Sequence, residues 1–198
     1  SGETSSYRSN PLGLAEFALS RKDPAYVGRA KEVQKAQKAI QEGKCPVEAL
    51  PEMKPVMDVI KKDYPNVSKE NLGVGSTIFA VKPGDGSARE QAASCQKVLG
   101  GWANIANEYA TKRYRSNLIN WGLLPLRTEE TLKIPVGSYL LIRDVRNVVS
   151  ECKNPIMVQV LDPASATVQS EITCTLDALT EDERKILLSG CLINYYRG

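Results

Sequence analysis

The spacing of apolar residues predicts a strand, a turn and a helix in the middle of the chain. An apolar run from Val74 to Val81, rich in β-branched residues, predicts a buried strand. After a turn with one proline and two glycines, the sequence predicts a helix that ends at Gly100-Gly101. Residues 102–108 then predict a second strand, and residues 110–121 predict a basic helix. We therefore expect two strands joined by helices in this region.

The two ends of the chain differ from each other in pattern. Residues 12–19 predict a short strand or helix, and helices are expected at 25–42 and 54–63. The late strands are expected at 138–145, 156–161 and 168–176, before a last helix at 180–196. This order predicts an α/β fold, with a mixed sheet or a small barrel-like β core flanked by helices.

Composition indicates one globular domain of 198 residues, with 42% hydrophobic and 25% charged residues. The net charge of +3 is too small and too dispersed to indicate nucleic-acid binding. No apolar run approaches the roughly 20 residues that cross a bilayer, so no membrane partner is expected. The five cysteines are widely spaced and form no C-x-x-C pair, which favours reduced thiols in a cytoplasmic protein.

The chain has no histidine. A Ser-His-Asp arrangement is therefore excluded, together with most catalytic zinc sites. Any chemistry must use serine, tyrosine, lysine or carboxylate side chains, or a group supplied from elsewhere.

The candidate chemistry lies in the turn at residues 82–91. Its proline and glycines allow a tight turn and close approach of a ligand to the backbone. Ser87 and Glu90 have capping-box spacing, so Ser87 is expected to begin the helix and to leave free N–H groups for an anion. Arg89 is in the first turn, where the helix dipole disfavours a cation, and a bound carboxylate would explain it.

These residues resemble a known family. The stretch Gly86-Ser-Ala-Arg-Glu90 is similar to the Gly-Ser-Ser-Arg-Glu signature of the aconitase superfamily. Leu99-Gly100-Gly101, Asn117-Leu118 and Gly122-Leu-Leu-Pro-Leu126 follow in the order and spacing of that family's C-terminal swivel domain. The resemblance covers about residues 74–126. It implies that residues 1–198 form one swivelling β/β/α domain with a helical insert at about 25–63.

The resemblance also implies roles for single residues. Ser87 matches the serine base of these hydro-lyases, which dehydrate and rehydrate hydroxy-di- or tricarboxylates. Arg89 matches the arginine that binds a substrate carboxylate, and Gly86 and Ala88 lie beside the substrate by the same match. Arg8, in Tyr-Arg-Ser, looks like the second substrate-binding arginine. Ala88 replaces a serine of the signature, which points to a changed substrate or reduced activity.

The resemblance further implies a 4Fe–4S cluster that cysteines of other domains hold, with none bound by this chain. The expected partners are N-terminal cluster-binding domains, in the same polypeptide or as a large subunit, so the isolated domain is expected to be inactive. The polar start without methionine favours a fragment of a longer protein. Two alternatives stay open, the small subunit of an isopropylmalate isomerase and a non-catalytic binding or regulatory relative.

Overall fold

A six-stranded mixed sheet forms the centre of the computed structural model, which describes residue 7, residues 9–21 and residues 23–197. The strands are β1 (Ser76–Ala80), β2 (Gly101–Ala106), β3 (Leu124–Arg127), β4 (Tyr139–Ile142), β5 (Ile156–Leu161) and β6 (Val168–Leu176). Their order across the sheet is β1-β2-β3-β6-β5-β4, so β1 and β4 are free edges. The predicted mixed sheet is confirmed, and it does not close into a barrel.

The sheet has a parallel half and an antiparallel half. β1, β2 and β3 pair in parallel, and helices α5 (Arg89–Val98) and α6 (Lys112–Asn120) are the connections between them. β4, β5 and β6 pair antiparallel as a meander. The halves join through β3 and β6, where only Leu126 with Leu176 and Arg127 with Thr175 are paired. The carboxyl ends of the three parallel strands therefore lie along one edge of the sheet.

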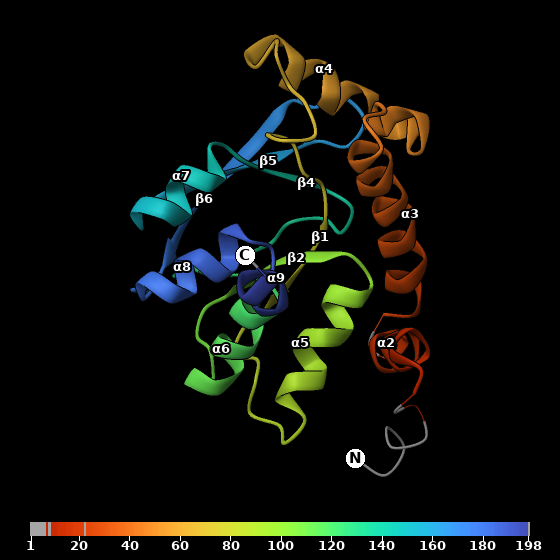
Figure 1. Ribbon diagram of the computed structural model, residues 1–198. Helices are drawn as coiled ribbons and strands as arrows, with labels where there is room; N and C mark the ends of the chain where they lie inside the picture. Colours follow the sequence, from red (N-terminus) through yellow and green to blue (C-terminus); the bar gives the residue numbers. More distant parts are fainter. Residues whose placement is uncertain (1–6, 8, 22, 198) are drawn as a thin grey trace.

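The remaining helices lie around this sheet (Figure 1). They are α2 (Pro11–Ser20), α3 (Pro24–Gln41), α4 (Lys54–Asp63), α7 (Val145–Glu151), α8 (Glu181–Leu188) and α9 (Leu192–Arg197), with 3-10 turns η1 (Pro46–Glu48) and η2 (Pro51–Met53). The helices expected at 25–42 and 54–63 are confirmed as α3 and α4. The hydroxyls of Tyr26 and Ser76, 3.1 Å apart, link α3 to β1, and Gln34 Nε2 donates to Val98 O at 3.0 Å. Although their status as an insert stays a prediction, α3 is bonded to both elements that flank the candidate turn.

The main hydrophobic core extends across both halves of the sheet. Ile105 and Leu126 of the parallel half pack in one buried cluster with Val158 and Ile172 of the meander, and Ile186 of α8 covers them. Each of these side chains is no more than 6% exposed, so the cluster excludes water. Burial of large aliphatic side chains contributes about 1.5–3 kcal/mol each, which makes this cluster the main link between the halves.

Four elements differ from the sequence predictions. The strand expected to be buried at 74–81 is the edge strand β1, whose residues alternate between partly buried and exposed, and no strand was expected at 124–127, where β3 lies. Residues 145–151 form α7 where the strand at 138–145 was expected to finish, and the last helix is broken into α8 and α9 near Gly190. Gly190 has a φ of +92°, which ends a helix, and its carbonyl lies against the Cα of Gly122 so closely that any side chain there would overlap it. In the described residues, no helix has the length and apolar content needed to span a bilayer.

Candidate functional site

The candidate turn connects β1 to α5 at the carboxyl edge of the parallel strands. It is the yellow-green loop at the lower end of α5 in Figure 1. In open α/β sheets, this edge is where ligands bind, because loops and helix N-termini converge there. The turn therefore lies at the edge where ligands commonly bind in such sheets.

The first half of the turn is held by the segment that leads into α6. The N–H of Ala110 donates to the carbonyl of Pro83 at 2.9 Å, and Thr111 Oγ1 donates to the carbonyl of Gly84 at 3.1 Å. Thr111 is also the N-cap of α6, since its Oγ1 accepts from the N–H of Tyr114 at 3.2 Å. The same residue therefore fixes both the turn and the start of the neighbouring helix.

Gly84 lies directly on the side chain of Tyr114. Its φ is +98°, and a Cβ at this position would be 2.5 Å from three side-chain atoms of Tyr114. The Tyr114 hydroxyl accepts from Gln96 Nε2 of α5 and from Asn104 Nδ2 of β2, both at 3.0 Å. Burial raises the pKa of Tyr114, and these two donors lower it in part, so the phenol is neutral at physiological pH. Tyr114 is thus a fixed, buried support beneath the turn.

The second half of the turn is open. Gly86, Ser87 and Ala88 are exposed, and a Cβ added to Gly86 would meet nothing within 4 Å. Within the described residues, the hydroxyl of Ser87 makes no hydrogen bond and is free to contact a ligand. The three small side chains leave space in front of the turn.

The predicted capping box is wrong. α5 begins at Arg89, and its N-cap is Ala88, which provides no side-chain acceptor. Glu90 is therefore one position too early for the capping partner, and its Oε1 accepts from Trp121 Nε1 at 3.0 Å instead. The indole N–H fixes the carboxylate against α6, so Ser87 is released from a capping role.

Arg89 is the charged group at the open end of α5. Its side chain is partly buried, and its buried Nε has no hydrogen-bond partner in the described part of the chain. The first backbone bond of the helix runs from Ala92 N–H to Ala88 O at 3.0 Å, so the N–H groups before it have no helical acceptor. An unpaired guanidinium beside free N–H groups suits a carboxylate, which can accept from both.

The position of Arg8 lies outside the described residues. α2 begins three residues after it and packs against α5, with Ala15 in one buried cluster with Cys95 and Leu99. Its predicted role stays a prediction.

Comparison with known proteins finds one family that is similar to this part of the chain. Residues 35–131 match the family model described as the aconitase C-terminal domain. This segment is therefore similar to the aconitase C-terminal domain family. The match includes the turn, α5, β2, α6 and β3, so the resemblance seen at residues 86–90 and 122–126 is confirmed.

One solved structure is also similar to the chain. It is 3-isopropylmalate dehydratase (leuD) from Methanocaldococcus jannaschii, with 29% sequence identity and a TM-score of 0.38. The alignment covers 71% of this chain and 72% of that chain. No curated protein matches the chain.

A cleft lies at the start of α6, and the sequence pattern did not indicate it. Its volume is about 230 Å³, and its walls are formed by Glu108, Tyr109, Thr111, Lys112, Arg115, Arg127 and Asp177. Arg127 Nε is 3.3 Å from Asp177 Oδ1, and Arg115 Nη2 donates to Asp177 O at 3.0 Å. These two arginines are already engaged, which leaves Lys112 as the cation of this cleft without an ion pair among the described residues.

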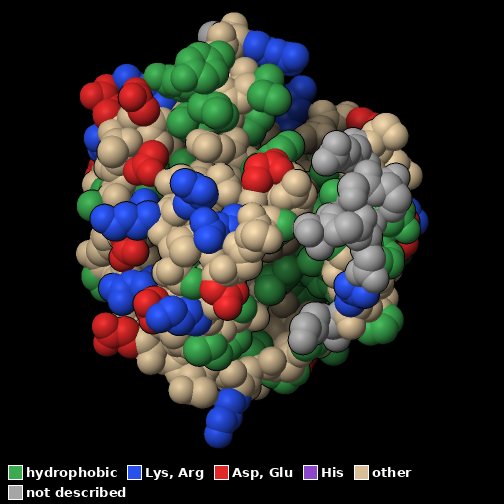
Figure 2. All heavy atoms as spheres, turned by 90° about the horizontal axis from the view of Figure 1, so that it is seen from below, with side chains coloured by type: hydrophobic (Ala, Val, Ile, Leu, Met, Phe, Trp, Pro, Cys, Tyr) green, Lys and Arg blue, Asp and Glu red, His purple; other side chains and the backbone are tan. Residues whose placement is uncertain are grey.

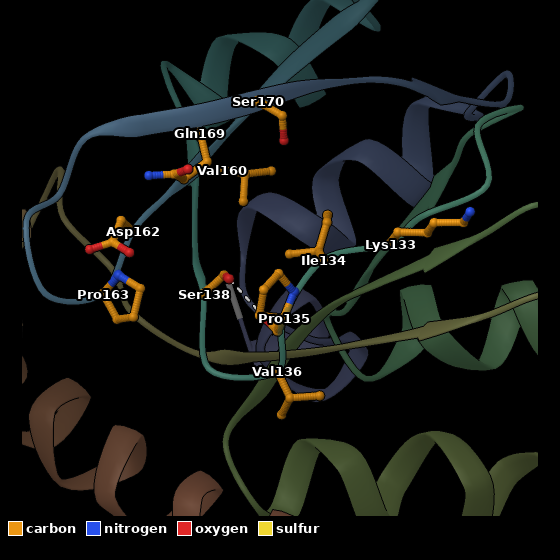
Figure 3. A pocket seen from close by; sticks show the side chains of 10 residues that line it. All are labelled: Lys133, Ile134, Pro135, Val136, Ser138, Val160, Asp162, Pro163, Gln169 and Ser170. Atoms are coloured by element: carbon orange, nitrogen blue, oxygen red, sulfur yellow. Dashed lines mark hydrogen bonds between the residues drawn. The ribbon is translucent and has the colours of Figure 1, made fainter.

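A larger cavity of about 440 Å³ lies away from the aconitase signature, between residues 133–138 and strands β5 and β6. Figure 3 shows Ile134, Pro135 and Val160 at its centre, with the charged ends of Lys133 and Asp162 on opposite sides. None of the predicted site residues lines it.

The cysteines do not fit the ligand set of an iron–sulfur cluster. Cys95 lies in the α2–α5 core, and Cys174 lies in the main core across the sheet. Burial raises the pKa of Cys174 to about 11, and the Glu130 carboxylate adds to that shift, so the thiol is protonated. Within the residues described, no three His, Cys, Asp or Glu side chains gather where they could hold a metal ion.

The face of the protein seen from below in Figure 1 carries both charge signs. Figure 2 shows lysine and arginine side chains interspersed with acidic ones, and a hollow with hydrophobic side chains inside it. This mixed pattern gives the face no uniform electrostatic field.

Proposed function

We propose that this chain is the swivel domain of an aconitase-like hydro-lyase, which dehydrates and rehydrates a hydroxy-di- or tricarboxylate. The observation that carries the proposal is Arg89, a cation with a buried and unpaired Nε beside the open N-terminus of α5. It lies inside the segment that matches the aconitase C-terminal domain. A polycarboxylate is the ligand class that uses such a group best.

In this proposal, Arg89 binds one carboxylate of the substrate. A guanidinium presents a planar fork of donors that pairs with both carboxylate oxygens, and Arg89 has no ion pair among the described residues that would compete. The N–H groups at the start of α5 add donors on the same side. The substrate is thereby oriented with its reacting carbon toward the turn.

Ser87 is the proposed base. A serine hydroxyl in water is a very poor base, and it becomes useful only where N–H groups and cations stabilise the alkoxide. Ser87 lies two residues before Arg89, the first residue of α5. Its hydroxyl oxygen makes no hydrogen bond to a side chain of the described residues. As an alkoxide, its Oγ would take the proton from the carbon beside a carboxylate while hydroxide leaves the neighbouring carbon, for which the cluster held by the other domains would supply the Lewis acid. In the reverse reaction water adds across the double bond and Oγ returns the proton.

Gly86 and Ala88 set the room around the substrate. No atom lies within 4 Å of where a Gly86 Cβ would be, so that space is available to a ligand. Ala88 presents a methyl group where the family signature has a hydroxyl. We propose that this difference redirects substrate choice by removing one hydrogen bond to the substrate.

The proposed enzyme needs more than this chain. We propose that N-terminal aconitase-like domains hold the 4Fe–4S cluster, either in the same polypeptide or as a large subunit. The isolated chain is then inactive. The assembled enzyme is proposed to be cytoplasmic. The cysteines of this chain do not fit such a cluster, so no step of the reaction is assigned to them.

The experiment starts from the gene. The proposal expects about 400 or more further residues with a C-x-x-C pair and one distant cysteine, in the same reading frame or in a separate gene. The assembled protein should then dehydrate a hydroxy-di- or tricarboxylate. Absence of both arrangements, or an assembled protein without this activity, would refute the proposal. An upstream match supports the fused form, and a separate gene supports the small-subunit form.

A further inference from the structure

The candidate turn is attached at both of its ends to one helix, α6. The residue before α6, Thr111, binds the carbonyl of Gly84 near the start of the turn. The residue after α6, Trp121, binds the carboxylate of Glu90 just past its end. Of the residues between these two attachments, 85–88 are exposed and Arg89 is partly buried.

We propose that Trp121 is a positioning residue, which orients Arg89 by holding Glu90. The consequence for catalysis rests on the proposed function, whereas the structural link does not. Among the described residues, Trp121 makes no hydrogen bond to a residue assigned to the substrate, and it acts through the carboxylate next to Arg89.

The bond is well suited to this task. Trp121 Nε1 is 3.0 Å from Glu90 Oε1, and a hydrogen bond to an ionised acceptor is stronger than a neutral one. The indole ring packs against a buried cluster that contains Ala93, Leu118 and Leu123. Because the ring is held by packing, the donor has a fixed position when the carboxylate reaches it.

Fixing Glu90 also fixes its neighbour. Consecutive side chains on an α-helix point roughly 100° apart, since the helix has 3.6 residues per turn. The hydrogen bond between Glu90 and Trp121 therefore restricts rotation of the first turn of α5 about the helix axis. This restriction also fixes the direction in which the Arg89 side chain leaves the helix. The first backbone bond of this turn runs from Ala92 N–H to Ala88 O, and the N–H groups before it have no acceptor within the helix.

Trp121→Phe tests the link, because it keeps an aromatic ring and removes the donor. Trp102→Phe is the matched control: Trp102 is 39% exposed, and its indole N–H has no partner in the described part of the chain. Amide hydrogen exchange is measured on the full 198-residue chain. Trp121→Phe should speed exchange at residues 92–95 about threefold or more, relative to residues 96–98, and Trp102→Phe should not.

A double variant makes the test specific to the pair. If Trp121 acts through Glu90, then Glu90→Ala should produce the same local change, and the double variant should be no worse than either single one. Additive effects, unchanged exchange in Trp121→Phe, or faster exchange spread over the whole chain would each overturn the link.

Activity of the assembled enzyme gives the second readout. Trp121→Phe should raise KM several-fold with a smaller change in kcat, because a displaced Arg89 loses its carboxylate contact. An unchanged KM together with faster local exchange would overturn the positioning role. A wild-type assembly without activity would refute the proposed function, while the exchange result would still decide the link.

Discussion

Two glycines in one turn should respond oppositely to the same substitution. Gly84→Ala places a methyl group 2.5 Å from the side chain of Tyr114, at a φ of +98° that alanine rarely adopts. Gly86→Ala places the same group in open space, at a position without that backbone constraint. The pair therefore separates the anchored half of the turn from its open half.

The cost of Gly84→Ala has two sources. A non-glycine residue in a sparsely populated backbone region costs about 1–3 kcal/mol. Overpacking against a buried side chain costs about another 1–3 kcal/mol. Together they give about 2–6 kcal/mol, a large part of the roughly 5–15 kcal/mol that stabilises a typical domain. Gly86→Ala should be neutral or should stabilise by up to about 1 kcal/mol, because alanine restricts the unfolded chain.

Urea unfolding measures both variants against the wild type. The midpoint should fall markedly for Gly84→Ala at an unchanged m value and should hardly move for Gly86→Ala. Gly86→Ala should nevertheless weaken substrate binding in the assembled enzyme, since its methyl occupies the space proposed for the ligand. Equal destabilisation by the two substitutions, or a harmless Gly84→Ala, would refute the assignment of Tyr114 as the support of the turn.

The other predictions concern charge and thiol chemistry. Ser87→Ala should reduce dehydration by the assembled enzyme at least about a thousandfold while its cluster absorbance is unchanged, since the proposed base is lost; retained turnover would identify another base. Arg89→Lys should raise KM about tenfold or more because the planar fork is lost, whereas Arg113→Lys, at an exposed position of α6, should leave KM unchanged. In the native chain at pH 8, iodoacetamide should leave Cys95 and Cys174 unmodified and should label the three other cysteines, as mass spectrometry can show. Burial raises the pKa of both protected thiols, and labelling of either one before unfolding would contradict the packing.

The strands with a clear apolar pattern were predictable from sequence. Those expected at 156–161 and 168–176 have the bounds of β5 and β6. β3 was missed because it is four residues long and contains Pro125, which normally argues against a central strand. The structure accommodates this proline because β6 pairs only with the two residues that follow it. The helix α7 was missed because its first residue, Val145, was read as the end of the apolar strand expected at 138–145.

The site was predictable as a location and less so as a geometry. Proline and glycine spacing indicated the turn, and an arginine at a helix start indicated an anion. Sequence spacing could not show that Trp121, thirty-one positions after Glu90, would take the carboxylate expected to complete the capping box. Nor could it show that Gly84 rests on Tyr114. Both are tertiary contacts, and local propensity does not contain them.

The two halves of the sheet are joined by few backbone hydrogen bonds and by a shared hydrophobic core. Two residue pairs connect β3 with β6, whereas the side chains of Ile105 and Leu126 share one core with the meander. The angle between the halves is therefore set by the shapes of aliphatic side chains more than by the hydrogen-bond ladder. The serine and arginine belong to the parallel half alone. A core substitution such as Leu126→Ala, far from any substrate, would change where this half points relative to the rest of the domain.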